Sequence, residues 1–186
     1  MLGVKVIMNW LNQLERKYGR YAVMNLMYYI VAANGAAFVL NLFAGGRLYY
    51  TLSLNPHLVL QGQVWRLITF IAVPPANNVL FLIIALYFYY MIGTNLEREW
   101  GSFKFNLFYL CGAVVTIIAS FITGATAPAY YLNLSLFLAF AYIYPNVEIM
   151  LYFILPVKVK YLGYLSCLYL LFVIVTSPLS HKIFAL

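Results

Sequence analysis

Long apolar runs separated by short polar stretches are the feature that most constrains this chain. The first run extends from Val23 to Phe43, and several others follow it. A helix needs about 20 such residues to cross the ~30 Å hydrocarbon core of a bilayer. Only 8% of the residues are charged and none is Asp, whereas a typical globular domain carries roughly 25% charged residues. The chain is therefore predicted to be an all-α integral membrane protein.

The composition also excludes several classes of protein. A chain that is 66% apolar is too hydrophobic for a disordered segment, a collagen-like repeat or a nucleic-acid-binding module. Cys111 and Cys167 are isolated within apolar runs, so neither a disulfide scaffold nor a metal site is predicted. We expect membrane lipids as partners, and no metal, cofactor or nucleic acid.

Five apolar segments have the composition of membrane spans, and the fourth is short. They are Val23–Phe43, Val79–Leu96, Phe103–Ile122, Ala129–Tyr144 and Tyr161–Ser177. Scattered Gly, Pro, Asn, Gln and Arg residues fill Ala44–Pro75, so a long, partly membrane-embedded loop is predicted there. The apolar run Ile149–Leu155 is too short to cross, and we expect it to lie at the interface or to re-enter the bilayer.

The basic residues predict how the protein is oriented. Residues 1–20 are predicted to include a cytoplasmic interfacial helix, because Lys5–Arg20 alternates polar and apolar residues at helical spacing. Residues 21–186 form the transmembrane domain. With the N-terminus in the cytosol, eight basic residues lie inside and three outside. We expect the cell (plasma) membrane, and the simple loops favour a bacterial inner membrane. A sixth span is expected beyond Leu186, because another apolar segment begins there.

Two polar motifs flank the second predicted span. Gly93, Glu97 and Gly101 are four residues apart and lie above one another on a helix. Glycines at this spacing let a neighbouring backbone approach closely, and Glu97 can bond a loop or an adjacent helix end. Trp65 and Arg66 pair an indole with a guanidinium, which is suited to holding the loop at the headgroup level. The alternative interpretations are a polar helix terminus and a generic aromatic anchor.

Few residues are candidates for catalysis. Ser135 lies on the outer half of the fourth span, and a serine nucleophile needs a base and oxyanion donors. His181 is a candidate base on the same side, and Asn77 and Asn78 are oxyanion candidates. The alternatives are structural, because Ser135 can bond a carbonyl one turn back and the two asparagines can cap a helix. Asn133 is best explained as an interhelical hydrogen-bonding amide.

Together these features resemble the rhomboid superfamily. The resemblance rests on the basic N-terminus, Trp65-Arg66, the Gly93, Glu97 and Gly101 motif, and Pro156–Lys160 before the fifth span. It implies a rhomboid-like helical bundle. Rhomboid proteases carry Gly-x-Ser-Gly on the fourth span and a histidine on the sixth. Here the sequence Asn133-Leu134-Ser135-Leu136 keeps the serine and lacks both glycines.

The same resemblance implies an inactive relative. Rhomboid proteases place an oxyanion-binding histidine and asparagine on the second span, where this chain has Phe81 and Ala85. The protein is thus similar to Derlins and other rhomboid pseudoproteases, which bind transmembrane segments of client proteins between the second and fifth helices. A working intramembrane serine protease with Ser135 as nucleophile is the alternative. A channel or transporter ranks last, because no span carries an intramembrane charge.

Overall fold

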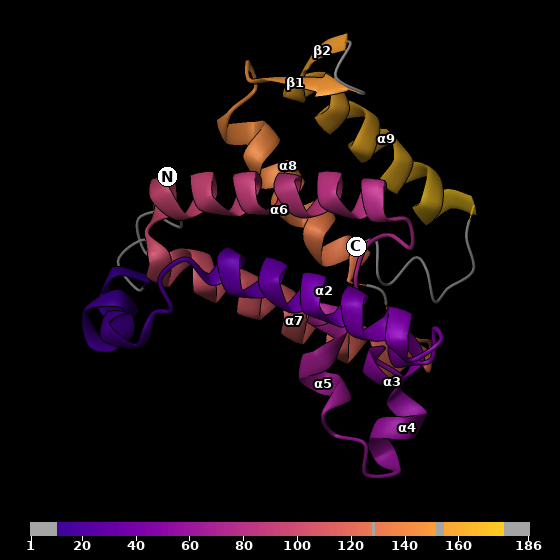
Figure 1. The fold of residues 1–186 in the computed structure, drawn as a ribbon. Coiled ribbons are helices and arrows are strands. Elements are labelled where there is room, and N and C mark those ends of the chain that lie inside the picture. Colours follow the sequence, from indigo (N-terminus) through magenta and orange to yellow (C-terminus); the bar gives the residue numbers. More distant parts are fainter. Residues whose placement is uncertain (1–10, 128, 152–154, 177–186) are drawn as a thin grey trace.

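The computed structural model describes residues 11–127, 129–151 and 155–176, which form mainly helices (Figure 1). Among these residues, three helices are long and apolar enough to cross a membrane: α2 (Leu26–Phe43), α6 (Val79–Trp100) and α7 (Ser102–Thr123). The apolar helix α8 (Tyr130–Ile143) has 14 residues, about 21 Å at 1.5 Å per residue. Crossing by α8 and by α9 (Val159–Thr176) stays a prediction.

Helix α6 is the element around which the others pack. It contacts α2, α7 and α8, and α9 packs on α8. In Figure 1, α6 and α2 run across the view next to each other. Buried apolar side chains of these helices form one cluster, which includes Met27, Ile92, Leu96, Phe105, Leu132, Leu136 and Phe140.

Glycines allow the close contacts between the helices. A Cβ atom at Gly93 of α6 would lie 2.4 Å from Cγ of Met27 on α2. A Cβ atom at Gly112 of α7 would lie 2.5 Å from Cδ1 of Leu132 on α8. Lipid chains are as apolar as leucine, so association of helices in a membrane depends on such close packing.

The segment between α2 and α6 folds into short helices. They are α3 (Leu48–Leu52), α4 (Pro56–Leu60), α5 (Arg66–Thr69) and the 3-10 helix η2 (Phe70–Ala72). Helix α3 packs on α2 and α5, and η2 packs on α2. In Figure 1, α3, α4 and α5 project below α2. None of these helices is long enough to cross a bilayer.

The expected all-α class is wrong in one place. Strand β1 (Glu148–Leu151) pairs antiparallel with β2 (Leu155–Lys158), and β2 packs on α9. The run Ile149–Leu155, predicted to lie at the interface or to re-enter, thus contributes to a hairpin. Pairing between the two four-residue strands provides hydrogen-bond partners for their backbone N–H and C=O groups. A single extended segment of this length would leave these groups without partners in the chain. Pro156 fits because a two-stranded sheet has only edge strands.

The N-terminal segment is only partly described. Residues 11–18 are helical and are followed by the 3-10 helix η1 (Gly19–Tyr21), which packs on α7. The first half of the predicted interfacial helix and the histidine at position 181 lie outside the described residues.

Candidate functional site

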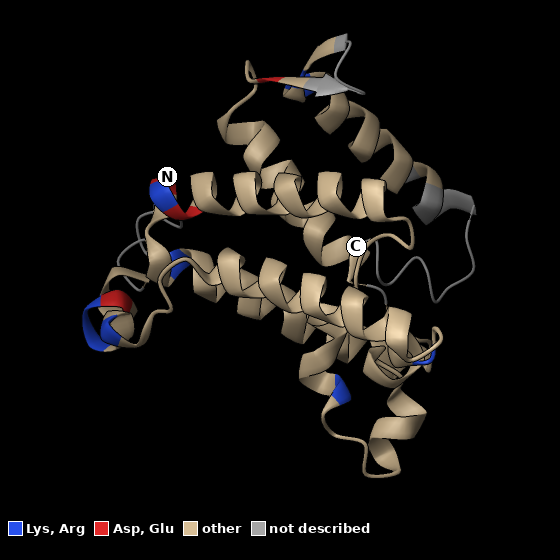
Figure 2. Cartoon of the chain, in the orientation of Figure 1, with Lys and Arg blue, Asp and Glu red and all other residues tan. Residues whose placement is uncertain are grey.

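Most charged residues lie in two groups, one around the segment before α2 and the α6–α7 connection and one on the hairpin, and together these are called the charged end (Figure 2). This end comprises the segment before α2, the α6–α7 connection and the hairpin between α8 and α9. The hydroxyl of Tyr144 joins two of these parts by donating to Oε2 of Glu99 over 3.3 Å. The charged residues of this end are Glu15, Arg16, Lys17, Arg20, Glu97, Arg98, Glu99, Lys104, Glu148, Lys158 and Lys160. The other described basic residues, Arg47 and Arg66, lie in the segment between α2 and α6.

Glu97 connects three helices at the charged end. Its Oε1 accepts the backbone N–H of Asn25 over 2.8 Å and the hydroxyl of Ser102 over 2.6 Å. Asn25 precedes α2, and Ser102 opens α7. The helix dipole disfavours a carboxylate in the last turn of α6 and favours one at the starts of α2 and α7. Gly101 makes the tight α6–α7 connection, with a φ of 83° that a side chain would strain.

Arg66 anchors the short helices from within. Its side chain is only 5% exposed. Nη1 donates to the carbonyls of Tyr50 and Ser53 over 2.5 and 2.7 Å, and Nε donates to Oε1 of Gln63 over 2.8 Å. Arg66 thus binds the open carbonyls at the end of α3, and a role for it at the headgroup level stays a prediction. Trp65 is 47% exposed, and its role as an interfacial anchor stays a prediction.

Ser135 has a bond within its own helix. Its hydroxyl donates to the carbonyl of Leu132 over 2.7 Å. Asn78 caps α6, with its side-chain oxygen accepting the N–H of Leu80 over 2.9 Å, and Asn77 is exposed. The one histidine in the described part of the chain, His57, lies exposed on α4. No hydrogen bond in that part joins Ser135 to a histidine or an asparagine.

Asn133 contributes a polar contact between α8 and α6. Its side chain interacts with that of Tyr89 on α6, while its Oδ1 is buried without a hydrogen-bond partner. An amide inside an apolar bundle favours a neighbour that can share hydrogen bonds. The contact therefore links the helix that carries Ser135 to the central helix.

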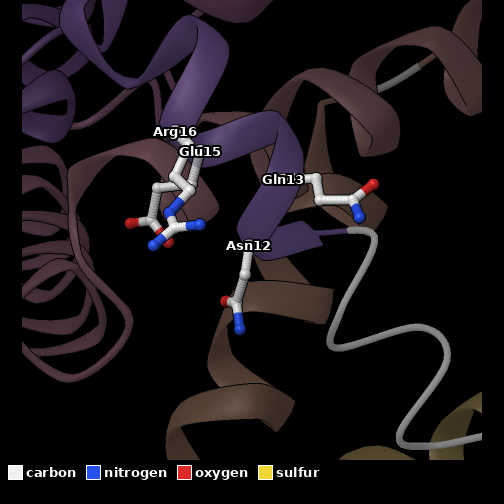
Figure 3. Close-up of a pocket in the computed structure, with 4 residues that line it drawn as sticks. All are labelled: Asn12, Gln13, Glu15 and Arg16. Carbon is white, nitrogen blue, oxygen red and sulfur yellow. The ribbon is translucent and has the colours of Figure 1, made fainter.

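Two hollows of the described structure contain polar side chains, and Ser135 lines neither of them. One, of about 590 Å³, is lined by Asn12, Gln13, Glu15 and Arg16 (Figure 3). In that view, Glu15 and Arg16 lie close together while Gln13 points away from them. The other, of about 380 Å³, is lined by residues that include Asn41, Tyr49 and Asn77. No cluster of potential metal ligands occurs in the described residues.

The faces of α6 and α9 are the region in which the rhomboid resemblance implies client binding. Helix α9 packs mainly on α8 and β2. Phe81 on α6 is 53% exposed, whereas Leu136 on α8 is 1% exposed and belongs to the core. Leu136 is thus part of the core, whereas much of Phe81 remains exposed among the described residues.

The sequence motifs do not reveal the partners of Glu97. Ser102 follows Gly101 at the start of a helix, so a search for helix-start signals would find it. Asn25 has a left-handed backbone with a φ of 54°. Asparagine tolerates this conformation better than most residues, but nothing near it in the sequence requires it.

Comparison with known proteins places the chain in a family. No curated protein and no solved structure matches it. A family model described as "Eukaryotic integral membrane protein (DUF1751)" matches residues 21–186. The expected bacterial inner membrane is therefore wrong, because short loops reflect how the helices are connected and do not report the source of the membrane. The chain belongs to the eukaryotic integral membrane protein family DUF1751.

Proposed function

We propose that this protein is a rhomboid-like membrane protein without proteolytic activity that binds transmembrane segments of client proteins. The observation that carries the proposal is the contrast between α9 and α6. Helix α9 is held by α8 and β2, whereas no described residue covers Phe81 of α6, which is 53% exposed. A client helix is the occupant that the resemblance implies for this face.

The chemistry of the exposed faces fits a helix better than a soluble ligand. Phe81 and Tyr87 on α6 and Tyr164 and Leu168 on α9 are all more than half exposed. Apolar contact alone gives little preference over lipid, so binding depends on close packing and on hydroxyl groups such as that of Tyr87. We therefore expect clients with small or polar residues within their transmembrane segments.

Site-specific photocrosslinking of the full chain in its native membrane tests client binding. A photoreactive residue at Phe81 is compared with one at Ile118 on α7, which is 52% exposed and so closely matched. We expect several-fold more adducts with transmembrane proteins at Phe81. Equal labelling at the two positions would contradict the proposal.

The lack of proteolysis has its own support and its own test. The Ser135 hydroxyl is bonded to the Leu132 carbonyl, and no described residue is placed to act as its base. We expect a fluorophosphonate probe to leave the purified full chain unlabelled. Labelling that disappears in Ser135→Ala would instead favour an intramembrane serine protease.

We further propose that the charged end faces the cytosol of the cell, as basic residues near the ends of spans favour. The described residues of this end include seven basic ones. In a plasma membrane, a maleimide that cannot cross the bilayer should label Arg47→Cys and not Lys17→Cys on intact cells. Cys111 and Cys167 are replaced by alanine in both variants. Labelling of Lys17→Cys alone would reverse the orientation.

A further inference from the structure

Three basic side chains at the charged end lie over tyrosine rings. The distance to the ring centroid is 5.3 Å for Nζ of Lys17 over Tyr18 and 5.1 Å for Nζ of Lys160 over Tyr161. For Cζ of Arg20 over Tyr21 it is 4.7 Å, and this guanidinium also donates to the Tyr21 hydroxyl over 2.6 Å. All three rings are exposed. Each cation is therefore held beside an exposed amphipathic ring.

Carboxylates do not neutralise these cations. The described charged end has seven basic residues and four glutamates, an excess of three positive charges. Among the described residues of the charged end, one ion pair occurs, between Nζ of Lys104 and Oε2 of Glu15 at 3.3 Å. Glu97 is engaged by α2 and α7, and Glu99 accepts from Tyr144. Within the described structure, Lys17, Arg20 and Lys160 have no acidic partner.

The tyrosine pairs lie just before one apolar helix and in the first turn of another. Lys17 to Tyr21 precede α2, and Lys160 and Tyr161 belong to the first turn of α9. Tyrosine favours the interface between the hydrocarbon core and water. A cation on such a ring lies at the level of the lipid phosphates, and anionic lipids attract juxtamembrane basic residues.

We propose that the charged end binds the headgroup phosphates of anionic lipids in the leaflet that it faces. Lys17, Arg20 and Lys160 supply the positive charge, and the phosphodiester oxygens take the place of the missing carboxylates. The tyrosine rings fix the cations at headgroup depth. This interaction is independent of client binding and of Ser135.

Lipid selectivity can be measured with the full chain in phosphatidylcholine nanodiscs. Electron spin resonance compares the association of spin-labelled phosphatidylserine with that of spin-labelled phosphatidylcholine. We expect a several-fold preference for phosphatidylserine that high salt weakens. Each basic residue close to an anionic lipid contributes up to about fivefold.

Two triple variants and one control test which groups are responsible. Lys17→Gln/Arg20→Gln/Lys160→Gln should abolish the preference. Tyr18→Leu/Tyr21→Leu/Tyr161→Leu keeps every charge and should reduce it at least twofold, because the cations lose their positioning. Arg47→Gln, which removes one charge elsewhere, should leave the preference unchanged.

Three results would overturn the proposal. The first is equal association of the two lipids with the unmodified protein. The second is a preference that either triple variant leaves intact, which would indicate diffuse charge without positioned groups. The third is displacement of phosphatidylserine by millimolar inorganic phosphate, which would identify a free phosphate as the ligand.

Discussion

The charged end and the short helices between α2 and α6 are secured by single side chains of opposite charge. Arg66 is buried and donates three hydrogen bonds, two of them to carbonyls near the end of α3. Glu97 is partly exposed and accepts two, at the starts of α2 and α7. Helix starts leave N–H groups open and helix ends leave carbonyls open, so each place requires the opposite charge.

Burial makes the two anchors unequal. Water can replace part of the hydrogen bonding that Glu97 provides, because the Glu97 side chain is only partly buried. Removal of the buried Arg66 side chain would leave two carbonyls in part-buried positions without their charged donor, and an unpaired polar group costs more there than in water. We therefore expect the Arg66 anchor to be the stronger one, and the following substitutions test this order.

Arg66→Ala should have the largest effect. Loss of the guanidinium leaves the carbonyls of Tyr50 and Ser53 unpaired, and we expect a loss of about 3 kcal/mol in the free energy of unfolding. Titration of the detergent-solubilised chain with a denaturing detergent measures it. Arg66→Lys keeps the charge but lacks the planar guanidinium, so its free energy of unfolding should lie between those of the unmodified protein and Arg66→Ala. An unchanged free energy of unfolding in Arg66→Ala would show that the hydrogen bonds of Arg66 are dispensable.

Gly93→Ala should come next, because it separates the helices that Glu97 joins. The added Cβ would overlap Cγ of Met27, and overpacking of this kind costs about 2 kcal/mol. The same unfolding titration measures the loss. Met27→Ala added to Gly93→Ala should recover part of it, whereas additive losses in the double variant would show that the two residues do not interact.

Glu97→Gln should have a smaller effect. The amide oxygen can still accept from Asn25 and Ser102, but without charge, and we expect a loss of about 1 kcal/mol. Glu99→Gln is the matched control, since Glu99 accepts only from Tyr144 in the described structure. If both variants lose the same stability, the position of Glu97 between three helices has no special value.

The smallest effect concerns the Tyr144 hydroxyl. Burial raises the pKa of Tyr144 from its ordinary value of 10.0, and the Glu99 carboxylate raises it further. The folded protein therefore keeps the Tyr144 proton at a pH where the unfolded chain loses it. As the pH rises above 10.0, the titration of Tyr144 thus lowers the free energy of unfolding. Tyrosinate absorbance, measured as a difference against Tyr144→Phe, should show a lower midpoint in Glu99→Gln. An unchanged midpoint would exclude the carboxylate as a cause.

The sequence predicts the membrane class well and the internal contacts poorly. Apolar length alone locates α2, α6 and α7, because a bilayer sets the length of a crossing helix. It cannot show that Ile149–Leu155 forms part of a hairpin, because a short apolar run fits a strand and an interfacial segment equally well. Strand pairing joins residues on the two sides of the hairpin, such as Glu148 with Lys158, and no local pattern specifies that register.

The candidate residues divide in the same way. Spacing places Gly93, Glu97 and Gly101 on one helix face, because helical periodicity is local. The burial of Arg66 depends on carbonyls 13 and 16 residues earlier in the chain, and no local pattern contains that information. Trp65 and Arg66 look like a pair in the sequence, yet one side chain is exposed and the other is buried.

The bond between Asn25 and Glu97 has a consequence for how the protein is made. Its two partners are 72 residues apart, so α2 leaves the ribosome well before the carboxylate that caps it exists. Until α6 is synthesised, the N–H of Asn25 depends on water or lipid headgroups for a partner. Helix α2 can therefore enter the membrane early, but it acquires its final position only when α6 has been synthesised.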